Sequence, residues 1–267
     1  MGDTIVLDGQ TSIVLSGGFD ADGFANGTYP SGDMIFSTAT TLREYLMKGC
    51  VNITSVDAPA ATMILERAFA GCTNLKSVNT PLAEEIRNYA FIDCTHLETV
   101  NAPEAYTVMN YAFKNCQSLK KINFPKAESI GVQCFHSVGT EASPVESIVL
   151  PSVESLNTEC FMHAHVNAID IGPGIGSLPS GAFSRSGDNY IPILILRSHD
   201  VVTTSTAGAI AGITANTKVY VPQDLIASYK AASRWSDKGD IFYPIEGSEY
   251  ETKYADGTPI QPAGGQS

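Results

Sequence analysis

Six cysteines are the residues of this sequence best suited to covalent or metal chemistry, because a thiolate can act as nucleophile, metal ligand or disulfide partner. Four follow one another at 22-residue steps, namely Cys50, Cys72, Cys94 and Cys116, and the other two are Cys134 and Cys160. On neighbouring helices, about 8–10 Å apart, they would be too distant for a disulfide, whose Cα atoms lie closer than about 7 Å. We therefore expect a ladder of small, buried hydrophobic side chains without disulfides or a metal.

Histidines offer the next possibility for chemistry. The pair in HAH (163–165) could bind a metal beside a carboxylate, but no ligand pattern recurs around it, and we expect it in a surface loop after Phe161. No Ser–His–Asp order or paired-carboxylate signature occurs at a meaningful spacing. GPGIG (172–176) lacks the Lys-Ser/Thr of a phosphate loop and indicates a turn. The sequence therefore predicts neither catalysis nor a cofactor.

The cysteine spacing belongs to a longer repeat. The segments AFAGCTNLKSVNTP (68–81), AFIDCTHLETVNAP (90–103) and AFKNCQSLKKINFP (112–125) each begin 22 residues after the last. Phenylalanines keep this step, with one interval of 26 residues, at Phe69, Phe91, Phe113, Phe135, Phe161 and Phe183. A period this short indicates small units that bury their apolar faces only by stacking on their neighbours.

Each unit divides into a strand and a returning segment. A β-branched residue three positions before a proline, such as Val78 before Pro81, predicts a short strand that the proline ends. Aliphatic residues two and five positions after the proline, such as Ala83 and Ile86, predict inward anchors. The segment NYAFIDC (88–94) then predicts one or two turns of helix from its i, i+3, i+4 apolar spacing.

The recurring pattern A-F-x-x-C-x-x-L-x-x-[VI]-x-x-P resembles the BspA-type leucine-rich repeats of bacterial surface proteins. The resemblance covers residues 46–197, with a weaker copy at 209–222, and the segment 219–245 looks like the closing module often found after such repeats. It implies an α/β fold, a curved leucine-rich-repeat solenoid of strand–turn–short-helix units with a parallel sheet on one face. It also implies binding or adhesion without catalysis, at the cell surface. Cys134 and Cys160 depart from the pattern by occupying the usual alanine position.

A solenoid needs caps that cover the two ends of its core. Residues 1–45 predict an N-terminal cap, with a β-hairpin from the runs at 5–7 and 12–15 and a short helix at 40–49 that leads into the repeats. The solenoid is expected over 46–222. Residues 223–245 predict a capping helix and a closing segment, in which Trp235 plugs the terminal core. Residues 246–267, rich in Gly, Pro and Thr, predict a flexible tail.

Two polar columns are expected on the outward side of the strands, because alternate side chains point to opposite sides and stacked strands lie about 4.8 Å apart. The first column reads Asp57, Asn79, Asn101, Asn123, Val149 and Asp170, and the second reads Ser55, Ser77, Thr99, Lys121 and Ser147. One interpretation is an amide ladder that steadies the stack. The other, compatible with it, is a ligand-binding face. Its candidate residues are Asp57, Ser77, Asn79, Thr99, Asn101, Lys121, Asn123 and Asp170.

Composition narrows the classes of function. The chain is 43% hydrophobic and 16% charged, which fits a folded protein, and its net charge of −12 argues against nucleic acid or anionic membranes as partners. No run approaches the roughly 18 apolar residues of a membrane span, and the N-terminus lacks the pattern of a signal peptide. One hypothesis is a non-catalytic binding or adhesion protein with a protein or glycan ligand. The alternatives are a phage virion component, such as a fibre or decoration protein, and an enzyme, for which no residue set is found.

Overall fold

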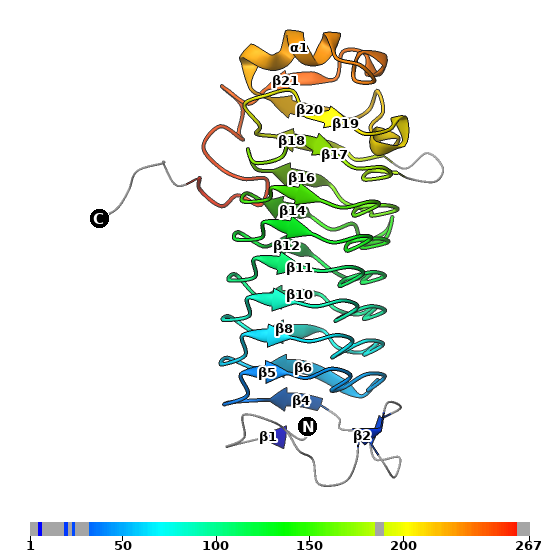
Figure 1. The fold of residues 1–267 in the computed structure, drawn as a ribbon, viewed down its shortest axis with the longest axis vertical. Coiled ribbons are helices and arrows are strands. Elements are labelled where there is room, and N and C mark those ends of the chain that lie inside the picture. Colours follow the sequence, from blue (N-terminus) through cyan, green and yellow to red (C-terminus); the bar gives the residue numbers. More distant parts are fainter. Residues whose placement is uncertain (1–4, 7–18, 21–22, 25–31, 185–189, 261–267) are drawn as a thin grey trace, which may run out of the picture.

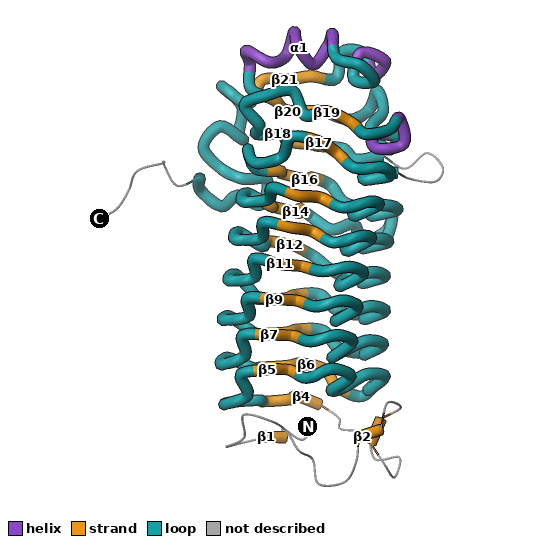
Figure 2. The backbone as a smooth tube through the Cα atoms, in the orientation of Figure 1, coloured by secondary structure: helices purple, strands orange, loops and turns teal. Residues whose placement is uncertain are grey.

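The protein forms one column of stacked turns of chain. The computed structural model describes residues 5–6, 19–20, 23–24, 32–184 and 190–260. Figure 1 shows the N-terminal strands at one end of the column and helix α1 (Ile226–Ala231) at the other. Each turn carries strands on two sides of the column, and loops connect them (Figure 2). The fold is a parallel β-solenoid with little helix, consistent with the predicted leucine-rich-repeat solenoid.

One side of the column carries the longer strands, in two parallel sheets. The first sheet has the order β1 (Ile5–Val6), β4 (Gly32–Ile35), β6 (Ile53–Asp57), β8 (Ser77–Asn79), β10 (Thr99–Asn101). The second has the order β12 (Lys121–Asn123), β14 (Ser147–Leu150), β16 (Ala168–Ile171), β18 (Ile193–Leu196), β20 (Lys218–Val221), β21 (Phe242–Pro244). Their register places the inward aliphatics of successive turns side by side, as in Val56, Val78 and Val100. We call the outward side of these two sheets the strand face.

The opposite side carries two-residue strands, which the sequence indicated only as anchors. They form a parallel sheet of β5 (Thr41–Leu42), β7 (Met63–Ile64), β9 (Glu85–Ile86), β11 (Thr107–Val108), β13 (Ser129–Ile130) and β15 (Ser155–Leu156). A separate parallel pair is β17 (Ser177–Leu178) with β19 (Thr203–Thr204), and an antiparallel pair is β2 (Phe19–Asp20) with β3 (Gly23–Phe24). The predicted anchors Ala83 and Ile86 are fully buried.

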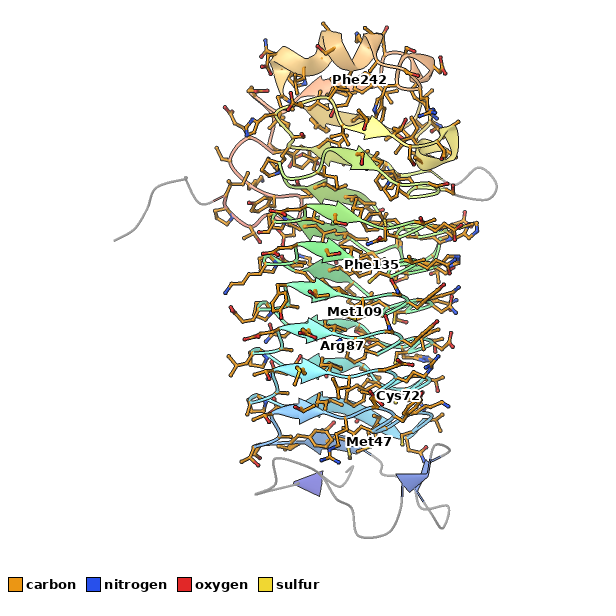
Figure 3. The ribbon with its side chains drawn as sticks, in the orientation of Figure 1. Met47, Cys72, Arg87, Met109, Phe135 and Phe242 are labelled. Atoms are coloured by element: carbon orange, nitrogen blue, oxygen red, sulfur yellow. The ribbon has the colours of Figure 1, made fainter. Side chains whose placement is uncertain are left out.

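The core lies between these two sides and consists of columns of identical residues. The six phenylalanines of the repeat are buried, and the rings of successive turns stack with centroids 5.2–5.8 Å apart. Figure 3 shows the side chains of successive turns one above another, with Phe135 labelled among them. The prediction that equivalent phenylalanines line up is confirmed. Each ring removes apolar surface from water only because the next turn covers it.

The predicted helix at 88–94 is wrong, since the segment makes tight turns instead. Tyr89 has a φ of 59°, in the left-handed region that interrupts a right-handed helix. Its N–H donates to the carbonyl of Asn110 in the next turn at 2.9 Å, whereas the N–H of Ala90 donates back to Arg87 at 3.2 Å. The backbone thus alternates between bonds within one turn and bonds between turns. An α-helix would keep all these bonds inside the segment and could not join the stack.

The N-terminal segment also differs from its prediction. The expected helix at 40–49 is absent, because Thr41–Leu42 forms β5 and pairs in parallel with β7, and the residues after it are turns. Stacking therefore begins before residue 46. Of the predicted hairpin, Ile5–Val6 is described, and it pairs in parallel with β4. The other predicted strand, at 12–15, lies outside the described residues.

Helix α1 and its neighbours cover the C-terminal end of the column. A 3₁₀ turn (Gln223–Leu225) precedes the helix, and two more lie at Ala207–Ile210 and Ser236–Lys238. Trp235 is fully buried, as predicted, and its indole N–H donates to the carbonyl of Val202 at 2.8 Å. Tyr229 packs on Phe242 with ring centroids 5.4 Å apart, and Figure 3 shows Phe242 beside the helix. These rings close the core where no further turn covers it.

Candidate binding face

The structure places the predicted polar columns on the strand face in the predicted register. Asp57, Asn79 and Asn101 are paired across β6, β8 and β10, and Asn123, Val149 and Asp170 are paired across β12, β14 and β16. The second column pairs Ser55, Ser77 and Thr99, and then Lys121 with Ser147. All eight candidate residues therefore belong to one face, but the two sheets give them different surroundings.

An amide ladder steadies the first sheet. The side-chain amide of Asn79 donates to the carboxylate of Asp57 at 2.7 Å, and the amide of Asn101 donates to the Oδ1 atom of Asn79 at 2.7 Å. One turn earlier, the hydroxyl of Ser55 donates to Asp33 at 2.6 Å, and this hydrogen bond lowers the pKa of the Asp33 carboxyl below its ordinary value. The structural interpretation of the ladder is confirmed for these turns.

The strand face is interrupted between β10 and β12, which are not paired in the described part of the chain. The residue before the repeat proline is small in the first sheet, as at Ala102, but it is Phe124 at the break. The buried Phe124 ring packs on Phe113 at 5.7 Å, between two columns of the core. We attribute the break to this change in volume, because a close-packed core cannot absorb a larger ring without moving its strand. Val100, the inward aliphatic at the break, is only half-buried.

A groove of about 350 Å³ lies on the strand face at this break. Residues of β8 and β10 form its floor and one wall, together with Pro103, Asn123 and Pro125. The candidate residues Ser77, Asn79, Thr99, Asn101 and Asn123 all line the groove. Thr99, Asn101 and Asn123 are exposed, so this part of the strand face is open to a ligand.

The other part of the strand face is covered by the chain's own residues 246–260, which we call the C-terminal strap. Figure 1 shows the strap beside β14, β16 and β18. The prediction of a flexible tail is therefore wrong for residues 246–260, and residues 261–267 lie outside the described part. Tyr250 of the strap is buried and forms an apolar cluster with Ile195 and Ile245. The physical reason is that outward residues of this sheet, such as Val149 and Ile195, are apolar and need a cover.

Asp170 lies beneath the strap and is not available to a ligand. Only 1% of it is exposed, and its two carboxylate oxygens accept from Nε and Nη2 of Arg197 at 2.7 and 2.8 Å. The Oδ2 atom also accepts from the N–H of Ala255 in the strap at 2.9 Å. Burial raises the pKa of the Asp170 carboxyl, and the Arg197 guanidinium opposes that rise. The prediction of Asp170 as a ligand-binding residue therefore places a buried structural ion pair on the binding face.

Arg197 fastens the strap to the sheet, a role that the sequence did not indicate. Beyond Asp170 it donates to the carbonyls of Tyr250 at 2.9 Å and Lys253 at 3.2 Å, and its guanidinium lies 5.1 Å from the ring centroid of Tyr254. A clue was present in the sequence, since outward positions that turn apolar predict a covering segment. Which segment supplies that cover is decided by contacts 53 or more residues apart.

The open part of the face carries carboxylates without a basic partner. Lys121 lies 3.4 Å from Glu146, and Lys120 pairs with Glu98, so these cations are balanced locally. In the described residues, no Lys or Arg forms an ion pair with Asp33, Asp57 or Asp256. The face therefore presents hydrogen-bond acceptors and negative charge to a partner.

The six cysteines are free and buried, as expected. The thiol of Cys94 donates to the carbonyl of Phe69 in the turn before, at 3.0 Å, and Cys72 and Cys116 repeat this contact. Burial raises the pKa of the Cys50 thiol to about 12, which keeps it protonated near neutral pH. The reason given from sequence was wrong, because these residues lie on stacked turns and not on helices about 8–10 Å apart.

The histidines form no metal centre. His163 packs edge-on against His136 with ring centroids 5.2 Å apart. Burial lowers the pKa of His136 to about 4, with Lys114 and His163 adding to the effect, so its ring is neutral at pH 7. No group of three or more His, Cys, Asp or Glu side chains across the described ranges is arranged to hold a metal ion. Nor does any helix in those ranges have the length and hydropathy to cross a bilayer.

The fold and its repeated units define a leucine-rich-repeat solenoid. Comparison with protein families matches residues 40–143 and 140–230 to the BspA type leucine rich repeat region, in six copies. The chain therefore belongs to the BspA-type leucine-rich repeat family.

Three solved structures illustrate the similarity in fold. The chain is similar to the leucine rich repeat protein of T. pallidum, with 20% identity over 79% of this chain and 85% of that chain, and a TM-score of 0.46. It is similar to a leucine rich cell surface protein from Faecalibacterium prausnitzii, with 16% identity over 74% of each chain and a TM-score of 0.31. A leucine-rich repeat protein from Bacteroides ovatus shows 16% identity over 81% of this chain and 84% of that chain, with a TM-score of 0.33. Comparison with curated proteins gives no match.

Proposed function

We propose that this protein is a non-catalytic binding protein that acts at the cell surface and presents the open part of its strand face to a protein or glycan partner. The observation that carries the proposal is the division of the face. The strap covers its apolar part, whereas Thr99, Asn101 and Asn123 stay exposed around a groove. A solenoid commonly uses such an extended surface for binding. The surface location is supported by the name of the F. prausnitzii structure and by what family resemblance implies.

Charge and chemistry narrow the proposal further. The net charge of −12 disfavours nucleic acid and anionic membranes as partners. The cysteines are buried and the histidines half-buried or locally bonded, which disfavours catalysis by either. The virion alternative stays a hypothesis, because no described feature of the fold favours it.

A triple variant tests the proposal. Partners are first identified by screening the purified protein against a glycan array and a panel of host surface proteins. Affinity for each hit is then measured for the variant Asn79→Lys, Asn101→Lys, Asn123→Lys. The matched control introduces three lysines at Gln117, Ala142 and Ala211, which are exposed in turns outside the strand face.

The two variants carry the same added charge, so they separate a local effect from a general one. We expect the strand-face variant to lose at least about tenfold in affinity while the control stays within about twofold. Thermal melting checks that both remain folded. Equal affinities for two folded variants would refute the proposal.

A further inference from the structure

The groove at the break between β10 and β12 contains groups whose usual hydrogen-bond partners are missing. In the turns before it, the N–H of Ala58 donates to the carbonyl of Asn79 at 2.8 Å, and the N–H of Thr80 donates to that of Asn101 at 2.9 Å. The equivalent N–H of Ala102, which is buried, makes no such bond with any described residue. Because buried backbone groups are nearly always paired, this donor marks a place for another molecule.

The amide ladder ends at the same point. Its rule is that each asparagine amide donates to the side chain of the turn before. Asn123 breaks the rule, because its amide donates to Oδ2 of Asp256 in the strap at 3.0 Å. The Oδ1 atom of Asn101 is therefore left without a donor among the described residues. The groove thus holds one free amide oxygen, with the Asp256 carboxylate on the far side of Asn123.

The lining of the groove favours a cation over a sugar. No aromatic ring lines it, whereas an exposed ring such as that of Tyr106 belongs to a different surface, where its hydroxyl donates to Glu85 at 3.1 Å. A neutral sugar would lack the stacking partner that such ligands commonly use. The Asp256 carboxylate has no basic partner among the described residues, as shown above, and a Lys or Arg side chain would supply both the missing charge and the missing donors.

We propose that this groove binds a lysine or arginine side chain presented by an extended segment of a protein partner, between Asn101 and Asp256. The inference rests on the proposed binding function and names the partner class for that face. The segment's backbone carbonyl accepts from the N–H of Ala102. Its cationic side chain donates to Oδ1 of Asn101 and to the Asp256 carboxylate. The strap is then part of the binding site as well as a cover.

The test uses a fluorescein-labelled peptide of alternating lysine and serine residues, measured by fluorescence anisotropy with the full chain at about 0.15 M salt, where distant charges are screened. Asp256→Asn removes the carboxylate and retains the shape. Its matched control is Asp224→Asn, an equal change of charge at an exposed residue beside helix α1. We expect about a tenfold loss of affinity for Asp256→Asn and less than about twofold for the control. Asn101→Lys, which places a cation in the groove, is expected to abolish binding.

Several results would overturn the inference. They are no measurable binding of the peptide, equal binding by Asp256→Asn and Asp224→Asn, equal binding of the same peptide with acetylated lysines, or displacement by a neutral oligosaccharide. Melting temperatures and the amide chemical shift of Ala255 check that the strap stays in place in each variant. A partner that is lost by the triple asparagine variant but kept by Asp256→Asn would reject this inference and leave the proposed function standing.

Discussion

Removing the positive charge of Arg197 tests how the strap is held. In Arg197→Met, the side chain keeps much of its apolar length but loses four hydrogen bonds, two to Asp170 and one each to the carbonyls of Tyr250 and Lys253. The carboxylate of Asp170 would then stay buried with the N–H of Ala255 as its remaining partner. The variant therefore leaves an uncompensated charge in the sheet.

The magnitude follows from burial. Side-chain exposure is 1% for Asp170 and 11% for Arg197, so solvent screens the pair little. Breaking such a buried pair from one side costs about 3–5 kcal/mol, which is a large part of the roughly 5–15 kcal/mol by which a domain is stable. For a chain of this size, the expected loss in melting temperature is at least about 6 °C.

The loss should depend on pH in a defined direction. Burial already raises the pKa of Asp170 in the folded protein, and removal of Arg197 takes away the group that opposes the rise. A carboxyl whose pKa is raised on folding binds its proton more tightly in the folded state. Its ionised form therefore costs stability above the folded pKa, and that cost vanishes as the pH falls through it. We expect the deficit of Arg197→Met to be largest at neutral pH and to shrink toward pH 4.

A double variant supplies the control. Asp170→Val with Arg197→Met removes both charges and extends the apolar column of Val149 and Ile195, which flank residue 170 in the register. Replacing a buried ion pair by packed apolar residues is often neutral, so the double variant should recover most of the stability. Urea denaturation of both variants across pH measures the free energy of unfolding, and trypsin cleavage at Lys253 measures detachment of the strap. Wild-type stability for Arg197→Met, or a deficit that grows toward acid, would refute this reasoning.

Three further predictions concern the core and the turns. Phe91→Ala should cost about 3–5 kcal/mol by urea denaturation, because the ring is buried between two others; a cost below about 1 kcal/mol would contradict the stacked column. Gly71→Ala should cost only about 1–2 kcal/mol, since the φ of 73° is the sole obstacle, whereas Gly172→Ala, whose Cβ would lie 1.8 Å from the carbonyl oxygen of Pro151, should prevent native packing, as near-UV circular dichroism would show. The six thiols should stay unreactive toward a thiol reagent at pH 8 in the native state and react fully in denaturant, because burial raises the pKa of the thiols; a rapidly reacting thiol in the native protein would contradict this.

Features that repeat every turn could be predicted from the sequence. The column of phenylalanines and the pairing of Asn79 with Asn101 both follow from the 22-residue period, because stacking brings equivalent positions together. The same argument placed the eight candidate residues on one face. Periodicity also located the inward anchors, such as Ile86, without showing that they form a second sheet.

The turns could not be predicted, because their apolar spacing is the same as that of a short helix. Tyr89 and Tyr111 take positive φ values of 59°, a conformation that tyrosine seldom adopts. Their rings stack with centroids 4.8 Å apart, and the guanidinium of Arg67 lies 4.2 Å from the ring centroid of Tyr89. These contacts between turns offset the backbone strain, and they exist only once the units are stacked.

Features that occur once had no comparable signal. The strap contacts Asp170 and Asn123 across 85 and 133 residues of sequence, and no repeat announces such contacts. Its composition resembles that of a linker, since it has few residues that could form a core of its own. It folds because the sheet offers Ile195 and Val149 as an apolar surface, so its structure is decided by residues elsewhere in the chain.

Two changes in the repeat coincide at the groove, and together they explain why the open face ends there. Inside the column, the residue before the proline changes from Ala102 to Phe124, which separates β12 from β10. Outside it, the first polar column changes from Asn123 to Val149, which calls for a cover. The first change exposes unpaired groups at the break, and the second brings the strap, with Asp256, up to their edge. A binding site at this position therefore needs no residue outside the repeat other than those of the strap, which is why substitutions at Asp256 and at Asn101 should act on the same ligand.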